Sequence, residues 1–221
     1  LSNDDHTLYA SPCFQTQVRL FDSRSGEPRV ARRGHGHAVW CLAFSPDGRR
    51  LASGGRDSTV RIWDVATGRE ERALTGDAER ILSLSFNPDG SRLLSRDENG
   101  NVTLWRTAEG TRVWSVRLGD GPWQQASFSP DGQTIAVTTR AGGVKFLRAS
   151  TGEEFRSWQS VHRGEALRVA FSPDGQRIAT TGSDRAVLVT DFVSGTRVRE
   201  LGHANTAVDV IEFSPDGTTL V

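Results

Sequence analysis

Methionine is absent from this 221-residue sequence, Lys145 is its only lysine, and cysteine occurs only as Cys13 and Cys41. Two cysteines cannot form the disulfide framework of a small secreted domain, so we expect a reducing compartment and a cytoplasmic location. No run of about 18 apolar residues is present that would cross a membrane. Because the chain begins at Leu1 and contains no methionine, we expect it to be a piece of a longer protein.

Net charge is missing as well, since 27 basic residues balance 27 acidic ones. Nucleic acids and anionic membranes select basic patches, so neither is an expected partner of this chain. The length is sufficient for one substantial domain with a sizeable core. The basic residues are almost all arginine, which hints at a GC-rich genome.

One turn motif occurs five times along the chain. The copies of Phe-Ser-Pro-Asp-Gly, with Asn for Ser in the second, begin at Phe44, Phe86, Phe128, Phe171 and Phe213. Proline presets φ at the first central position of a turn, aspartate bonds the nearby backbone, and glycine tolerates a positive φ. Since an apolar strand residue precedes the turn and a small apolar run follows it, each copy predicts a β-hairpin.

Each period of 42 or 43 residues predicts four short strands separated by turns, and none shows a helical pattern. This pattern indicates an all-β fold with less than about 5% helix. No linker or charge block separates the copies, so they form one cooperative array. The sequence divides into a partial repeat at 1–33, full repeats at 34–75, 76–118, 119–160 and 161–201, and a partial repeat at 202–221.

The repeat resembles the WD-repeat (WD40-type) family, whose period is about 40–45 residues with Gly-His early and Trp-Asp late. Gly34-His35 and Trp63-Asp64 match those two dipeptides. The resemblance implies a β-propeller of four-stranded antiparallel blades, and the arginine-rich composition favours a bacterial member. Family members usually close with seven blades. About five repeats therefore predict an open arc of a longer ring, and the alternative is a small closed ring with a displaced strand.

In the family that this chain resembles, a hydrogen-bonded set of His, Ser or Thr, Asp and Trp often stabilises each blade. The resemblance implies this structural role for His35, Ser53, Asp57 and Trp63, for Ser95, Asn99 and Trp105, and for His162, Thr180 and Asp184. The repeat at 119–160 has lost the set. The fold prediction does not depend on these losses, because the hairpins and the apolar pattern persist in every copy.

Catalytic and metal-binding interpretations of the same residues have less support. His35, Ser53 and Asp57 have the residue types of a hydrolase triad, but no nucleophile elbow or oxyanion loop accompanies Ser53. His35 and His37 supply too few ligands for a metal site. The acidic stretch at 97–101 lacks the closing glutamate of a calcium loop and reads better as a hairpin turn. We therefore expect no catalytic residue, no metal and no cofactor.

The starts of the innermost strands are the candidate partner-binding site, because the resemblance implies that WD-repeat proteins often bind partners there. For Trp40 and Trp123, simple packing stays open as the alternative. Aromatic and arginine side chains on a rigid rim are typical of binding hot spots. The candidate residues are Trp40, Arg80, Leu82, Trp123, Gln124, Leu167 and Asp209. The strand starts among them are mostly non-titratable, which favours binding over catalysis.

The sequence thus predicts a non-catalytic β-propeller that binds a protein or peptide as a scaffold or sensor domain of a larger signalling protein. The resemblance implies fusion to an NTPase, kinase or protease domain. The alternative is a propeller enzyme with its site at the channel mouth, which would require convergent acidic or histidine residues there. Fold alone does not decide between the two.

Overall fold

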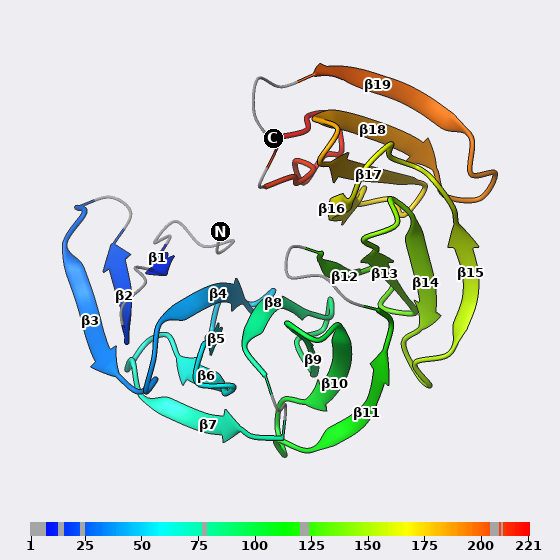
Figure 1. Ribbon diagram of the computed structural model, residues 1–221. Coiled ribbons are helices and arrows are strands. Elements are labelled where there is room, and N and C mark those ends of the chain that lie inside the picture. Colours follow the sequence, from blue (N-terminus) through cyan, green and yellow to red (C-terminus); the bar gives the residue numbers. More distant parts are fainter. Residues whose placement is uncertain are drawn as a thin grey trace. The chain divides into compact units, whose positions relative to one another are not determined.

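Nineteen β-strands and no helix form the part of the chain that the computed structural model describes, residues 8–12, 16–22, 25–76, 79–119, 124–203, 208 and 210–221. The all-β prediction is confirmed. No candidate membrane-spanning helix occurs among these residues. The chain forms two compact units, 1–117 and 118–221, each with its own antiparallel sheets (Figure 1).

Unit 1 contains three sheets, and in each of them neighbouring strands are consecutive in sequence. The first sheet consists of β1 (Leu8–Pro12), β2 (Gln17–Asp22) and β3 (Pro28–Arg33). The second consists of β4 (Val39–Phe44), β5 (Arg50–Gly55), β6 (Val60–Asp64) and β7 (Glu70–Leu74). The third consists of β8 (Ile81–Phe86), β9 (Arg92–Asp97), β10 (Asn101–Arg106) and β11 (Arg112–Arg117).

Unit 2 contains two four-stranded sheets with the same sequential order. One consists of β12 (Ala126–Phe128), β13 (Thr134–Thr138), β14 (Val144–Arg148) and β15 (Glu154–Trp158). The other consists of β16 (Ala166–Phe171), β17 (Arg177–Gly182), β18 (Ala186–Asp191) and β19 (Arg197–His203). The last strand ends two residues beyond Leu201, the predicted end of its repeat. The four-stranded antiparallel blades are confirmed, whereas the repeat boundaries stay a prediction.

The recurring turn motif forms the hairpin between the first two strands of each four-stranded sheet. In the first copy Ser45 Oγ donates to Asp47 Oδ1 at 2.6 Å, and Arg49 N donates to the same oxygen at 3.0 Å. Gly48 has a φ of 68°, which glycine adopts without the steric cost that a Cβ would add. The hydrogen bonds from Ser45 and the Arg49 amide lower the pKa of the Asp47 carboxyl. The turn is therefore stabilised by side chains inside the motif itself.

Apolar side chains from neighbouring sheets form the core of each unit. In unit 1, Ile62 and Leu74 of the second sheet pack with Ile81, Leu84 and Phe86 of the third. In unit 2, buried residues of β13, β14, β16 and β17 form a corresponding cluster that includes Phe146, and Trp158 packs against it. Burial of large apolar side chains between sheets is the main stabilising contribution in such a stack, at about 1.5–3 kcal/mol per side chain.

The two incomplete repeats retain the same register. Tyr9 pairs with Phe21 in the first sheet as Leu51 pairs with Trp63 in the second, so β1 corresponds to the second strand of a complete sheet. In unit 2, Ile211, Phe213 and Leu220 pack on the sheet β16–β19, and Phe213 forms a single bridge with Leu220. The prediction of an open arc depends on how the two units are placed relative to each other, so it stays a prediction.

Candidate partner-binding site

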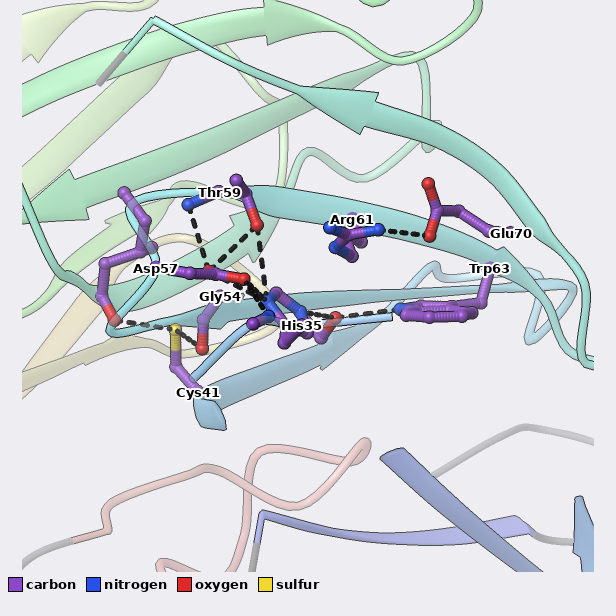
Figure 2. A network of polar contacts seen from close by, with 11 residues as sticks. His35, Cys41, Gly54, Asp57, Thr59, Arg61, Trp63 and Glu70 are labelled. Carbon is purple, nitrogen blue, oxygen red and sulfur yellow. Dashed lines mark hydrogen bonds and ion pairs between the residues drawn. The ribbon is translucent and has the colours of Figure 1, made fainter. Parts of the chain in front are cut away.

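A chain of four side chains connects the loop before β4 to the sheet β4–β7. Trp63 Nε1 donates to Ser53 Oγ at 2.8 Å, and Ser53 Oγ lies 2.7 Å from His35 Nε2. His35 Nδ1 lies 3.0 Å from Asp57 Oδ1, which follows β5 (Figure 2). Ser53 is fully buried and His35 is 4% exposed. A chain of hydrogen bonds in such surroundings is mutually strengthening because each bond polarises the next.

The charges of this network follow from its geometry. Burial lowers the pKa of His35 below its usual 6.5 and outweighs the opposing effect of Asp57. The neutral ring then donates from Nδ1 to Asp57 and accepts at Nε2 the proton of Ser53 Oγ. Burial alone would raise the pKa of the Asp57 carboxyl, but hydrogen bonds from His35, the Gly36 amide and Thr59 lower it. At neutral pH an ionised carboxylate therefore accepts from a neutral imidazole.

The network restrains the loop that leads into β4, where Trp40 of the candidate site lies. The Gly36 amide donates to Asp57 Oδ2 at 2.8 Å, and the Arg56 amide donates to Ala38 O at 2.8 Å. These bonds join the loop before β4 to the turn after β5, shortly before Trp40 in the sequence. Ser53 is fully buried and its hydroxyl is engaged by His35 and Trp63, so it offers no access to a substrate carbonyl. The arrangement is suited to stabilising the backbone next to Trp40 rather than to nucleophilic attack.

The sheet β16–β19 carries a three-member version of the network. His162 Nδ1 lies 3.0 Å from Asp184 Oδ1, and His162 Nε2 lies 2.9 Å from Thr180 Oγ1. Thr190 occupies the position of Trp63 and is 5% exposed. Burial again lowers the pKa of His162, against the opposing effect of Asp184. The structure thus brings together all three residues that the sequence singled out here.

The sheet β8–β11 corrects one assignment. Trp105 Nε1 donates to Ser95 Oγ at 2.8 Å, as expected. Asn99, predicted to replace Asp57, is instead exposed on the turn. The buried carboxylate of Asp97, two residues earlier, accepts from the Asn101 amide at 2.9 Å and from Asn101 Nδ2 at 2.7 Å. Because Asp97 lies at the end of β9, its side chain reaches the turn from within the sheet.

A side-chain cap on the amide at the start of the third strand, or on the residue just before it, is the feature that all four complete sheets share. Asp57 caps Thr59 at 3.2 Å and Asp184 caps Ala186 at 3.2 Å. Thr139 Oγ1 accepts from the Gly143 amide at 3.0 Å in the repeat that has lost the other residues. Sequence reasoning missed Asp97 and Thr139, because they stand two positions before the expected aspartate.

In unit 1 the candidate partner-binding residues lie where β4 and β8 begin. Trp40 is half-buried, and the guanidinium carbon of Arg80 lies 5.8 Å from the centre of its ring. Arg80 Nη1 is 3.5 Å from Glu98 Oε1, and 36% of the Arg80 side chain is exposed. Leu82, in β8, is also half-buried. An arginine stacked on an indole beside a half-buried leucine offers both charge and apolar area.

In unit 2 the candidates Gln124 and Leu167 are 2% and 8% exposed. Burial leaves them little surface for a partner, which counts against their predicted role. Gln124 Nε2 donates to Glu165 Oε2 at 3.4 Å, and Arg140 Nε donates to Glu165 Oε1 at 3.2 Å. Sequence reasoning overlooked Glu165, although it occupies the repeat position of Arg80. Trp123 and Asp209 lie outside the described residues.

Comparison with known families supports this architecture. The WD40 model, described as WD domain, G-beta repeat, matches residues 26–64, 68–106 and 155–191. A second model, the Anaphase-promoting complex subunit 4 WD40 domain, matches residues 97–164. None of the curated proteins compared with the chain matches its sequence. WD40 repeats generally act as protein-interaction scaffolds, and their propellers are typically non-catalytic. Since the first model matches more than half of the sequence, this chain belongs to the WD40 repeat family.

Proposed function

We propose that this chain is a non-catalytic scaffold that binds a protein or peptide partner where β4 and β8 begin. The observation that carries the proposal is the stack of Arg80 on Trp40, which is partly exposed and sits next to the hydrogen-bonded loop of His35 and Asp57. Tryptophan and arginine on a rigid support are the residue types that dominate binding energies. Trp40 lies in β4 and Arg80 directly precedes β8, so both are held close to a sheet and little ordering is required on binding.

The alternative of an enzyme site at the same place is less well supported. Of the predicted strand starts that the structure describes, Trp40, Leu82, Gln124 and Leu167 carry no titratable side chain. The histidines with lowered pKa, His35 and His162, are buried inside the blades at 4% and 3% exposure. A reaction centre needs titratable groups that meet a substrate in a common pocket.

The wider setting of the domain belongs to the same proposal. We infer a cytoplasmic scaffold or sensor domain of a bacterial multidomain signalling protein, joined to an NTPase, kinase or protease domain. The two cysteines and the arginine-rich composition support this inference. Sequencing of the complete gene tests it, because a chain without any catalytic domain would contradict the proposed fusion.

Selection from a displayed random peptide library tests the binding site itself. We expect enriched peptides whose affinity for the chain falls by at least about tenfold in Trp40→Ala, as truncation of a hot-spot residue costs more than about 1.4 kcal/mol. The matched control is Phe155→Ala, because Phe155 is an exposed aromatic of the outer strand β15. Equal effects of the two substitutions, or an absence of enriched peptides, would contradict the proposed site.

A further inference from the structure

The corner between neighbouring blades at the starts of the innermost strands carries a different charge in the two units, neutral in unit 2 and positive in unit 1. In unit 2 this corner consists of Gln124, Arg140 and Glu165. Glu165 supplies a carboxylate that accepts from Arg140 at 3.2 Å and from Gln124 at 3.4 Å. An arginine of one blade is thus neutralised by an acid of the next blade, within the chain itself.

Unit 1 places different residues at two of these three repeat positions. Trp40 stands four residues before Phe44, as Gln124 stands before Phe128. Arg56 stands twelve residues after Phe44 and corresponds to Arg140. Arg80 stands six residues before Phe86, as Glu165 stands before Phe171, so an arginine replaces the acid. We call Trp40, Arg56 and Arg80 the Trp40 corner.

The Trp40 corner lacks the carboxylate that its counterpart contains. Arg56 is exposed, and within the described ranges no acidic side chain pairs with its guanidinium. Glu98 Oε1 lies 3.5 Å from Arg80 Nη1, and the Glu98 side chain is 37% exposed. Glu98 therefore forms a long, partly solvated ion pair with one of the two arginines. A guanidinium has five donors, and the contacts of Arg80 with Glu98 and Trp40 leave some of them for another acceptor.

We propose that the Trp40 corner binds an acidic side chain of a partner peptide, whose carboxylate takes the place between Arg56 and Arg80 that Glu165 takes beside Arg140. The proposal rests on the proposed function and adds the chemistry of the partner. An apolar side chain next to the acid contacts the exposed part of the Trp40 ring and Leu82. Arginine favours carboxylates because its planar fork of donors matches their two oxygens.

A nucleic acid would also present anionic groups, but the charge balance favours a peptide. Phosphate backbones are held by several cations in a row, whereas this chain carries 27 basic and 27 acidic residues. Glu98 lies at the corner and would repel a run of phosphates. A single carboxylate between two arginines avoids most of that repulsion.

The test measures two properties of the selected peptides: their content of Asp and Glu, and the dependence of their affinity on Arg80. Peptides from the displayed library that require Trp40 are expected to be rich in Asp and Glu. Their affinity, measured by fluorescence anisotropy, is expected to fall by at least about tenfold in Arg80→Glu and to weaken with added salt. Arg80→Lys keeps the charge and should retain part of the binding. Arg112→Glu is the matched control, because Arg112 is exposed on the outer strand β11 and makes the same charge change.

The outcomes separate this proposal from the proposed function. Peptides that require Trp40 but are not acidic, or that bind Arg80→Glu unchanged, overturn the acidic partner and leave the binding site standing. An absence of Trp40-dependent peptides overturns both. A labelled uridine oligonucleotide forms the last arm, and Arg80-dependent binding of that probe without acidic peptides overturns the proposal in favour of RNA. Thermal melts of each variant confirm that the exposed substitutions leave the fold intact.

Discussion

The sheets β4–β7 and β16–β19 each hold a histidine at the same repeat position. The hydrogen-bond network around it has four side chains in the first sheet and three in the second. In the first, Ser53 Oγ serves two partners, Trp63 and His35. In the second, Thr180 Oγ1 lies against His162, and the tryptophan position is filled by Thr190. Both histidines are buried and both lie 3.0 Å from their aspartate. The comparison shows that the His–Asp contact forms without the tryptophan, which adds a further donor rather than the geometry.

The largest expected effect comes from removing the central hydroxyl of each network. Ser53→Ala leaves the indole N–H of Trp63 and the His35 ring nitrogen unpaired, so we expect a loss of about 2–3 kcal/mol in the free energy of unfolding. Thr180→Val leaves only the His162 nitrogen unpaired and should cost about 1–2 kcal/mol. Urea denaturation of the two variants measures both values. Equal costs would mean that the tryptophan bond contributes nothing to stability.

Acid should weaken both networks through their histidines. The folded-state pKa of His35 and His162 lies below the usual 6.5, so the unfolded chain binds protons first as the pH falls. Their contribution is therefore complete above pH 6.5 and declines as the pH drops below that value. Asp57 and Asp184, whose pKa lies below the usual 3.8, keep their contribution over this interval.

Urea midpoints between about pH 7.5 and 5.5 measure this decline. His35→Asn should make it shallower, since one of the two buried imidazoles no longer titrates. His37→Asn is the matched control, because His37 is exposed. A variant His35→Asn with an unchanged slope would show that the buried histidine does not control acid stability.

The smallest expected effect is the difference in the free energy of unfolding between the variants Asn99→Ala and Asp97→Ala. Asn99→Ala removes an exposed side chain and should change the free energy of unfolding by less than about 0.5 kcal/mol. Asp97→Ala removes the acceptor of the Asn101 amide and should cost about 1 kcal/mol more than Asn99→Ala. Thermal melts of the pair check this order. A larger cost for Asn99→Ala would restore the role that the family resemblance implied for it.

Much of the architecture could be predicted from the sequence because its signals are local. The hairpin turns recur where Ser45, Pro46, Asp47 and Gly48 stand within one another's reach, and the structure shows the bonds that these residue types predict. The role of His35 and its partners followed from a family pattern. The cap by Asp97 did not follow, because a side chain can reach the same amide from either of two backbone positions.

Local chemistry and period alone thus determined that this chain forms short antiparallel strands in repeated hairpins. Only the tertiary structure decided which side chains meet at the corners between blades. Arg80 rests on Trp40, forty residues earlier, and Glu165 meets Arg140, twenty-five residues earlier. Such pairs depend on how neighbouring sheets stack, and stacking is driven by non-directional burial of apolar area that leaves polar partners unspecified. The charge of each corner therefore emerges only when the blades are packed.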